Sequence, residues 1–333
     1  MQKKRYMKRT AITGLLLIVL ITAGSPTNLW SQTDHALNVA LLPILDTFPF
    51  YVAQARGYFD RYAVTVTPIP VSSGLERDQL MQSGAVDGML NEMATTANFN
   101  REQLQVRIVA TARKAYPHYP LFRILSAPGS GLSSPADLNG IPIGISKNTI
   151  IEYVTDRLLA AGGLSPDQIV KKSVPAIPER YQLLLQGQLK AATLPDPLAK
   201  SALEAGAGSV IDDSTHPLYS ISVLSFNMEA LKTKADTVRQ FLKAWNQAAQ
   251  DINADPESYR GLLLQKIRVP KNIQQTYRIP PFPLREIPVA ESWADVMDWM
   301  VSKGLLKVPI PYKDSITADY LPGGRKSKPN TTQ

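Results

Sequence analysis

A set of acidic, hydroxyl, amide and aromatic side chains has the chemistry to hold a small molecule. Hydroxyl and amide groups suit a small anion, whereas carboxylates beside aromatic rings suit a flat ligand that carries N–H donors. We expect a binding role for these residues and no catalytic role, because no nucleophile, base and orienting group recur at a catalytic spacing. The candidates are Asp46, Phe48, Tyr51, Ser72, Ser73, Asn91, Glu92, Tyr116, Ser146, Asn148, Thr149 and Asp196.

Most of these candidates follow directly after a β pattern. Ligands of open α/β sheets bind outside the carboxyl ends of the strands, where helix N-termini present free N–H groups. A simpler interpretation stays open, since Ser72 and Thr149 can serve as helix caps and Asp46 can hold a turn. Strand 37–42 precedes Asp46, Phe48 and Tyr51; strand 64–66 precedes Ser72 and Ser73; strand 86–90 precedes Asn91 and Glu92; strand 141–145 precedes Ser146, Asn148 and Thr149; strand 191–194 precedes Asp196.

The elements that position these residues alternate between strand and helix. Thr149 and Glu152 have capping-box spacing at the start of one helix, and Ser165 and Gln168 have it at the start of another. After about residue 226 the pattern becomes mostly helical, with one apolar stripe over 238–252 and another over 293–300. Further strands are predicted at 107–112, 121–126, 209–212 and 220–226, so the pattern is that of an α/β fold.

Two segments carry a resemblance to a known family. In residues 49–90 an apolar helix stops at Gly57, a Tyr-Phe pair and a Val-Thr-Val strand follow, and a second helix stops at Gly84 before Val86-Asp87. Residues 129–145 read GSGLSSPADLNGIPIGI. Both resemble the NMT1/THI5-like family of type II periplasmic binding proteins, which serves importers of sulfonates, nitrate, riboflavin and thiamine precursors. Ala63 departs from the glycine that is usual before the Val-x-Val strand, which puts only that turn in doubt.

The resemblance implies two lobes that close on a solute, each a mostly parallel sheet flanked by helices. We expect the chain to cross between them at residues 116–121 and 216–222. Lobe 1 is then 37–118 plus 222–320, lobe 2 is 119–221, and 321–333 is a polar tail. The resemblance also implies a small-molecule ligand, a membrane permease and an ATPase as partners, and no cofactor. We expect a monomer.

Residues 1–25 have the organisation of an export signal. Basic residues precede an apolar run over 11–23, which is about 13 residues long and shorter than the ~20 needed to span a bilayer. Thr22-Ala23-Gly24-Ser25 resembles a lipobox with Ser25 where a lipidated cysteine would stand. We therefore expect an exported protein, periplasmic or at the cell surface, with an N-terminal membrane anchor as the alternative.

Charge and composition exclude several other classes. The chain has 36 Lys and Arg against 28 Asp and Glu, but five of the basic residues lie in the first nine positions and three in the tail, which leaves 28 of each sign. A nucleic-acid binder needs a clustered basic surface, and none is visible. There is no cysteine, and His35, His118 and His216 form no metal-binding pair, so we expect neither thiol chemistry nor a metal site.

The class of solute depends on the carboxylates. Asp46, Glu92 and Asp196 near one cleft would repel a small anion, whereas a flat nitrogen heterocycle would stack on Phe48, Tyr51 or Tyr116 and donate hydrogen bonds to the acids. A thiamine or flavin precursor is thus favoured, with Asp196 and Glu92 expected to reach it from opposite lobes. A sulfonate or nitrate binder, an enzyme of the same fold and a sensor module remain the alternatives. The THI5-type pyrimidine synthases carry a cysteine-rich motif that this sequence lacks.

Overall fold

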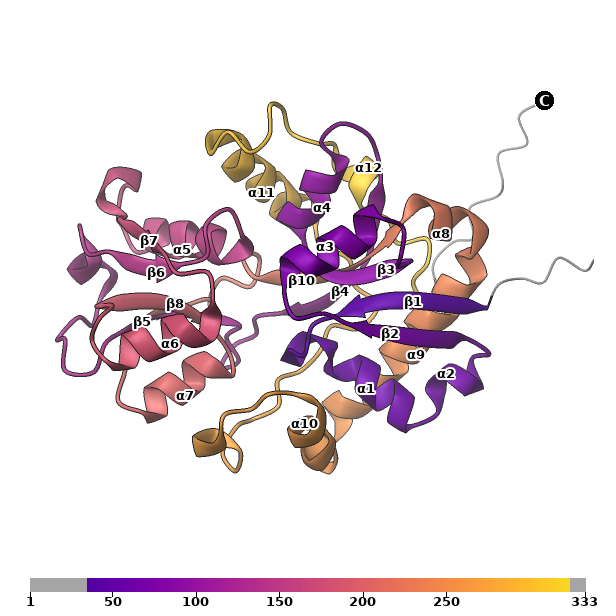
Figure 1. Cartoon of the computed structure of the whole chain (residues 1–333), viewed down its shortest axis with the longest axis horizontal. Coiled ribbons are helices and arrows are strands. Elements are labelled where there is room, and N and C mark those ends of the chain that lie inside the picture. Colours follow the sequence, from indigo (N-terminus) through magenta and orange to yellow (C-terminus); the bar gives the residue numbers. More distant parts are fainter. Residues whose placement is uncertain (1–34, 324–333) are drawn as a thin grey trace, which may run out of the picture. The chain divides into compact units, whose positions relative to one another are not determined.

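The computed structural model describes residues 35–323. The predicted export signal and the last ten residues of the polar tail lie outside this range. The described chain is built on two five-stranded sheets flanked by helices, which confirms the predicted α/β class (Figure 1). Within residues 35–323 no helix is long and apolar enough to span a membrane.

The first sheet has the strand order β2-β1-β3-β10-β4. Strand β1 is parallel to both of its neighbours, and β10 is antiparallel to both of its own, so four of the strands run one way and β10 runs against them. The strands are β1 (Ala36–Leu41), β2 (Thr65–Pro70), β3 (Gly88–Glu92), β4 (Val106–Lys114) and β10 (Ile221–Asn227).

The second sheet repeats this plan with the order β7-β6-β8-β5-β9, in which β5 is the reversed strand. The chain passes from the first sheet to the second over residues 115–121 and returns over 213–220. The strands are β5 (Phe122–Ser126), β6 (Ile143–Ile145), β7 (Lys171–Ser173), β8 (Ala191–Pro195) and β9 (Gly208–Asp212).

Helices cover both faces of each sheet. In Figure 1, α1, α2 and α9 lie on one side of the first sheet with α3 and α4 on the other, and α5 lies opposite α6 and α7 on the second sheet. The helices are α1 (Phe48–Ala55), α2 (Tyr58–Arg61), α3 (Gly74–Gln82), α4 (Met93–Asn100), α5 (Ile150–Ala161), α6 (Ile177–Leu185), α7 (Leu198–Glu204), α8 (Met228–Thr233), α9 (Ala235–Ala254), α10 (Arg260–Lys266), α11 (Ala290–Ser302) and α12 (Tyr312–Ser315).

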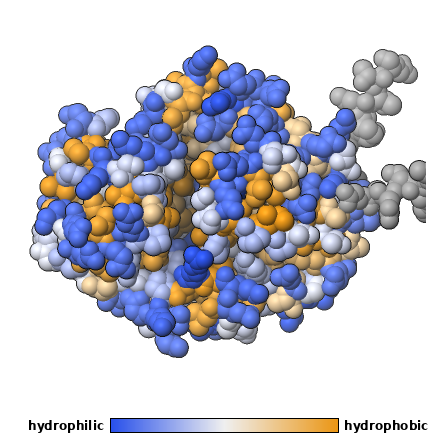
Figure 2. Space-filling model, viewed as in Figure 1, coloured by the Kyte–Doolittle hydropathy of each residue, from blue (hydrophilic) through white to orange (hydrophobic). Residues whose placement is uncertain are grey.

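Both predicted apolar stripes are buried. The α9 stripe, which includes Phe241 and Trp245, packs under the first sheet. The α11 stripe, which includes Trp293 and Met300, belongs to a cluster that also contains Met93 of α4 and Val154 of α5. Helix α11 is therefore packed against elements of both sheets. The face drawn in Figure 2 is largely hydrophilic, with scattered apolar patches, and it is hollowed between the two groups of elements.

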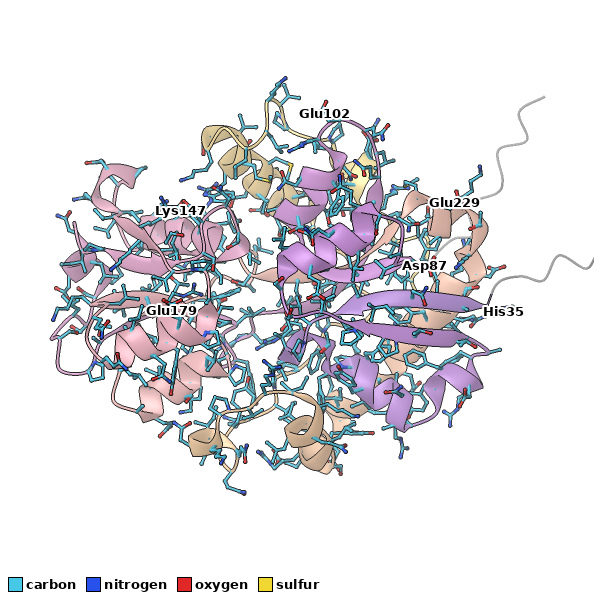
Figure 3. All side chains as sticks on the ribbon, in the orientation of Figure 1. His35, Asp87, Glu102, Lys147, Glu179 and Glu229 are labelled. Atoms are coloured by element: carbon cyan, nitrogen blue, oxygen red, sulfur yellow. The ribbon has the colours of Figure 1, made fainter. Side chains whose placement is uncertain are left out.

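Asp87 has a structural role in the first sheet. Its Oδ2 accepts a hydrogen bond of 2.8 Å from the Asn38 amide of β1, and its Oδ1 lies 3.1 Å from Lys234 Nζ. Figure 3 shows Asp87 beside the first sheet. The aspartate of the predicted Gly-x-Val-Asp pattern thus ties β1 to the turn before β3.

Four elements differ from the prediction. Ser165 and Gln168 form both hydrogen bonds of a capping box, but the helix they open is a single 3-10 turn, Pro166–Gln168, because Ile169 is already extended. The parallel strand β7 that follows was not predicted. Strand β2 also begins later than the predicted Val64, and β3 runs on to Glu92 instead of ending at Leu90.

Candidate functional site

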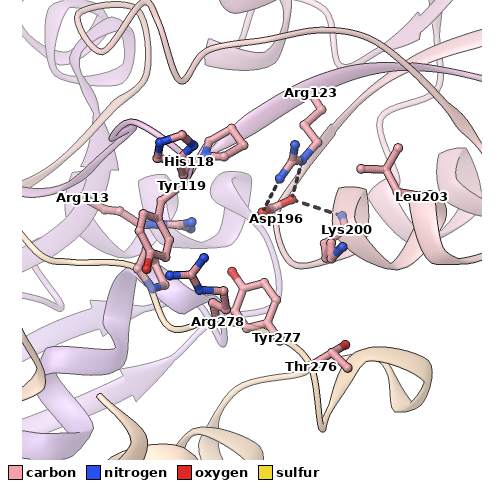
Figure 4. A pocket seen from close by; sticks show the side chains of 12 residues that line it. Arg113, His118, Tyr119, Arg123, Asp196, Lys200, Leu203, Thr276, Tyr277 and Arg278 are labelled. Carbon is pink, nitrogen blue, oxygen red and sulfur yellow. Dashed lines mark hydrogen bonds and ion pairs between the residues drawn. The ribbon is translucent and has the colours of Figure 1, made fainter. Parts of the chain in front are cut away.

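A cavity of about 260 Å³ lies where the two sheets meet, beside the first chain crossing. Its lining comes from the end of β4, the crossing segment, β5, the turn after β8, α7 and an extended segment that follows α10 (Figure 4). The lining residues are Arg113, His118, Tyr119, Pro120, Arg123, Asp196, Lys200, Leu203, Thr276, Tyr277, Arg278 and Pro280.

Arg113 brings a buried positive charge to this cavity. Its side chain is 2% exposed, and its Nη1 donates a 2.9 Å hydrogen bond to Asp46 Oδ1. Burial alone would lower the pKa of Arg113, but Asp46, together with Tyr277 and Asp196, outweighs it and the net shift of the pKa is upward. The predicted candidate Asp46 therefore holds a cavity residue and does not itself line the cavity.

Asp196 lines the cavity from the other sheet. Its carboxylate accepts hydrogen bonds from Arg123 Nε at 3.3 Å, from Arg123 Nη2 at 3.4 Å and from the Lys200 amide of α7 at 3.1 Å. Burial raises the pKa of Asp196, and Arg123 and Arg113 oppose that rise. Arg123 Nη1 also lies 3.2 Å from Asp212, so the guanidinium is shared between two carboxylates.

Aromatic rings form a second part of the wall. The Tyr277 side chain is buried, and burial raises the pKa of its phenol, so the group is neutral at pH 7. Figure 4 shows its hydroxyl pointing into the space between Arg113 and Asp196. The guanidinium carbon of Arg278 lies 5.2 Å from the centre of the Tyr119 ring, a cation–π contact.

The lining is predominantly basic. Arg113, Arg123, Lys200 and Arg278 carry positive charge, and Asp196 is the one carboxylate among the described residues that line the cavity. Asp46, Asp212 and Glu204 pair with the first three of these cations from behind the wall. The sequence suggested a cleft lined mainly by acidic residues, whereas the cavity in the structure is lined mainly by basic residues.

The aromatic candidates after β1 lie elsewhere. The Phe48 ring is fully buried and packs 6.4 Å from the ring of Phe282. Tyr51 packs against the same apolar cluster, with Lys266 Nζ 5.8 Å from its ring centre. The Phe48 ring is therefore not available for stacking by a ligand in this structure, because it is fully buried in the core.

Ser72, Ser73 and Asn91 make local hydrogen bonds in the first sheet. Ser73 caps α3 by accepting from the Glu76 amide, while the amide and hydroxyl of Ser72 both donate to Glu76 Oε2 at 2.7 Å. Asn91 is fully buried and donates from Nδ2 to the Thr96 hydroxyl at 2.9 Å. None of the three lines the cavity, so the simpler interpretation of Ser72 as part of a helix cap fits the geometry.

Glu92 lies at a different place from Asp196. Its Oε2 is 3.5 Å from Arg77 Nη1 and accepts a 3.0 Å hydrogen bond from the Thr95 hydroxyl. It lines a separate hollow of about 10 Å³ together with Tyr153 of α5 and Val296 of α11. The structure does not bring Glu92 and Asp196 into one cavity, because each lines a different one.

The loop before α5 is also engaged in capping. Thr149 accepts a 3.1 Å hydrogen bond from the Ile151 amide and donates to the Ser146 carbonyl at 2.8 Å. The carboxylate of Glu152 accepts from the Asn148 amide, one residue earlier than the capping box predicted. Ser146 donates to the Pro175 carbonyl and accepts from the buried Arg180. Figure 3 labels the neighbouring Lys147 at this end of the second sheet.

Tyr116 lies on the crossing, two residues before the cavity-lining His118. Its backbone pairs with that of Tyr119, and Lys114 Nζ lies 5.4 Å from its ring centre. Burial and the nearby Glu286 raise the pKa of Tyr116 to about 12. Tyr116 thus shapes the turn that presents His118 and Tyr119.

Sequence reasoning missed most of the cavity lining. Arg113 directly follows the predicted strand 107–112, and Arg123 lies inside the predicted strand 121–126. The predicted chain crossing between these strands was the one sequence feature that pointed to them. Tyr277 and Arg278 lie between the two predicted helical stripes, in a part of the chain for which the sequence predicted no helix or strand. No group of three or more His, Cys, Asp or Glu side chains in the described part of the chain is arranged to hold a metal ion.

Comparison with known proteins places this architecture in a family. Residues 45–259 match the family described as NMT1/THI5 like. The chain belongs to this family. It is 26% identical to the riboflavin-binding protein RibY of Chloroflexus aurantiacus, over 96% of this chain and 99% of that protein. It is 28% identical to the formylaminopyrimidine-binding protein of Halalkalibacterium halodurans, an alignment that covers 49% of each protein.

Solved structures show the same fold at low identity. The periplasmic aliphatic sulphonate binding protein SsuA from Escherichia coli superposes with a TM-score of 0.71 at 17% identity, over 86% of this chain and 98% of its own. The desulfurization enzyme DSZB superposes with a TM-score of 0.63 at 13% identity, over 86% and 97%. The NMT1/THI5-like chain therefore has the periplasmic-binding-protein fold, which binding proteins and an enzyme share.

Proposed function

We propose that this protein is the extracytoplasmic solute-binding component of an ABC importer and that it binds one small molecule in the cavity at Arg113 and Asp196. The main support is that residues from both sheets line this cavity. Arg113 comes from the first sheet, and Arg123 and Asp196 come from the second. Such a site is created when two α/β lobes close on a solute. The family match and the binding proteins among the relatives support the proposal.

The solute that we favour is a flat nitrogen heterocycle such as a thiamine or flavin precursor. Tyr119 and Tyr277 offer aromatic surface on the same cavity as Asp196. A carboxylate accepts up to about four hydrogen bonds, and Arg123 and the Lys200 amide supply three to Asp196. The remaining capacity suits an N–H donor on the ligand. Two relatives named for binding riboflavin and a formylaminopyrimidine support this class.

An anion such as a sulfonate is the second candidate, and the charge of the wall favours it. Arg278 has its guanidinium against Tyr119 and forms no ion pair with any residue of the described range 35–323, while Arg113, Arg123 and Lys200 each face a carboxylate. A small anion would complete the charge balance of this wall. A heterocycle would depend on Asp196 for binding, whereas an anion would depend on Arg278. Single substitutions at these two residues therefore distinguish the two classes of solute.

Binding without conversion is part of the proposal, with an enzyme of the same fold as the rival. The sequence contains no cysteine, so a thiol nucleophile is excluded for this chain. Asp196 is tied to Arg123 and to the α7 amide, an arrangement that holds a carboxylate in place instead of freeing it to move a proton. A sensor that passes its ligand to another membrane partner is the remaining alternative, and a neighbouring permease gene would argue against it.

The cellular setting follows from this role. We propose an exported, monomeric protein, periplasmic or at the cell surface, that delivers its solute to a membrane permease driven by an ATPase. The lobes are then residues 37–118 plus 222–320 and residues 119–221. Co-purification with the permease encoded nearest to the gene is the direct measurement of that partnership.

A thermal-shift screen tests the proposed function. A ligand that binds only the folded protein raises the melting temperature by mass action. The probes are 4-amino-5-hydroxymethyl-2-methylpyrimidine, riboflavin, methanesulfonate and nitrate, and mass spectrometry of molecules released on denaturation identifies any solute carried through purification. A single clear stabiliser that is recovered unchanged supports the proposal. Chemical conversion of that stabiliser by the protein alone would show an enzyme instead.

A further inference from the structure

The segment that closes one wall of the cavity, residues 267–282, is anchored to the first sheet. We call it the strap. Its apolar side chains are buried in the same core cluster as strand β1 and helix α9, so the strap moves with the first sheet. The buried side chains are Ile267, Val269, Ile273, Tyr277, Ile279 and Phe282.

One residue of the strap reaches across to the second sheet. Asn272 accepts a 2.8 Å hydrogen bond from the Ser201 hydroxyl and donates a 3.1 Å hydrogen bond to the Ser201 carbonyl. Ser201 is fully buried on α7, where its hydroxyl also lies 2.9 Å from the Tyr181 hydroxyl. Asn272 itself is exposed. This reciprocal pair spans the gap between the strap and the second sheet.

The strap also supplies part of the cavity lining. Thr276, Tyr277, Arg278 and Pro280 line the cavity, only a few residues beyond the contact with Ser201. The match to the family ends at residue 259, so the strap lies outside the matched range. The strap thus lines the cavity and also holds the two lobes together. A solute that contacts the strap would therefore affect how far apart the lobes lie.

The opposite side of the interface is fastened more firmly. There α11 packs in the apolar cluster shared by α4 and α5. Lys303, at the end of α11, lies 2.8 Å from Glu152 of α5, and Asp295 of α11 lies 2.8 Å from Arg157. Buried apolar contacts and ion pairs resist separation more than two neutral hydrogen bonds of an exposed amide. Opening is therefore expected on the strap side.

We propose that the strap is the gate of the cavity, with Asn272 as its latch on Ser201. The cavity is already partly accessible, since His118 and Arg278 of its wall are exposed. Breaking the latch lets α7 swing away from the strap and widens this opening, while the α5–α11 side stays closed as the pivot. Only the ligand experiment below depends on the proposed function, because access to the cavity is measurable without a solute.

Thiol labelling in a chain that has no natural cysteine tests the gate directly. Leu203→Cys places a reporter thiol in the cavity wall, and the probe is a small neutral maleimide. We expect Asn272→Ala to speed labelling of Cys at position 203 by about 5-fold to 10-fold, the effect of losing one to two neutral hydrogen bonds. Ser201→Ala keeps the carbonyl that Asn272 binds, so its effect should be smaller. Gln275→Ala, an exposed strap residue, is the control and should leave the rate unchanged.

The labelling rates distinguish a gate from a strap that plays no part in access to the cavity. Equal labelling rates in the Asn272→Ala, Gln275→Ala and parent proteins would overturn the gate. Melting curves of each variant identify a loss of folding, and a variant that melts much earlier is replaced by Asn272→Asp, which keeps the acceptor for Ser201 and loses the donor. That variant should label at a rate between those of the parent and Asn272→Ala, and a rate equal to the parent's would overturn the latch.

The same variants then serve in a ligand experiment with 4-amino-5-hydroxymethyl-2-methylpyrimidine and methanesulfonate as probes. For whichever probe binds, Asn272→Ala should raise the dissociation rate by a factor similar to the labelling factor. An unchanged dissociation rate would overturn the strap as a gate for solute. If the wild-type protein binds neither probe, the proposed solute classes fail, and the labelling rates alone decide the gate.

Discussion

Asp213, on the second chain crossing, accepts a 2.8 Å hydrogen bond from the backbone amide of Leu121 on the first. Its other carboxylate oxygen accepts from the Phe122 amide at 2.9 Å, and the Asp213 amide donates back to the Phe122 carbonyl. The two crossings are therefore pinned together at one fully buried carboxylate. These hydrogen bonds fix the spacing between the two crossings.

This pin should make stability depend on pH. Burial raises the pKa of Asp213 from 3.8 to about 6, against the opposing effect of the two amide hydrogen bonds. The folded protein therefore holds a proton that the unfolded chain has already lost, and stability should fall by about 2 to 3 kcal/mol as pH rises from about 4 to 6, then level off. Asp213→Asn should flatten that slope in urea unfolding curves. Asp236→Asn, at an exposed site, is the control and should keep it.

Glu152 should give the opposite pH dependence. Burial raises its pKa, but hydrogen bonds from Lys303, the Asn148 amide and Lys171 outweigh that effect and bring the pKa to about 2. Its contribution is thus present above pH 4.5 and lost as pH falls from 4.5 towards 2. Glu152→Gln should cost about 1 to 3 kcal/mol at pH 7 and much less at pH 2. An equal loss at both pH values in chemical denaturation would show that its charge is irrelevant.

The order of the elements was predictable from the sequence because apolar runs and local caps determine it. The strand over 107–112, the helix that begins after Thr149 and the α9 stripe all depend on residues close together in the chain. The cavity was not predictable in the same way. Arg113, Asp196 and Tyr277 are far apart in sequence, and their proximity depends on how the strap and the crossing pack.

The candidate site residues also differ in how far the sequence could predict their roles. Thr149 was placed correctly at a helix start, and Ser72 was placed one residue before the capping Ser73. Both hydrogen-bond to their own helix, and the sequence cannot distinguish such local hydrogen bonding from ligand binding. Asp196 was identified because it follows the predicted strand 191–194, and it lines the cavity. Arg278 was overlooked because an extended segment has no periodicity from which the direction of a side chain follows.

Asp196→Ala should weaken the binding of a nitrogen heterocycle by about 1 to 3 kcal/mol, because a ligand donor is left unpaired in a closed site. We also expect the unliganded protein to lose stability, since Arg123 and the Lys200 amide lose their shared partner. Glu92→Ala should leave affinity unchanged, because Glu92 lines a different hollow. Calorimetric titration with 4-amino-5-hydroxymethyl-2-methylpyrimidine measures both, and full affinity in Asp196→Ala would remove the case for a heterocycle.

Arg278→Gln separates the two solute classes most directly. Its guanidinium lies on the Tyr119 ring at the cavity wall, so an anion bound there would lose a charge-assisted hydrogen bond, worth about 1.5 to 3 kcal/mol or at least tenfold in affinity. A neutral heterocycle should lose less than about threefold, since Gln keeps an amide donor. Stability should change by less than about 0.5 kcal/mol, as is usual at an exposed site. Arg268→Gln, exposed on the same strap and away from the cavity, is the matched control. Titration with methanesulfonate decides the matter: a tenfold loss in Arg278→Gln alone supports the anion, and equal affinity in both variants rejects a role for Arg278 in binding it.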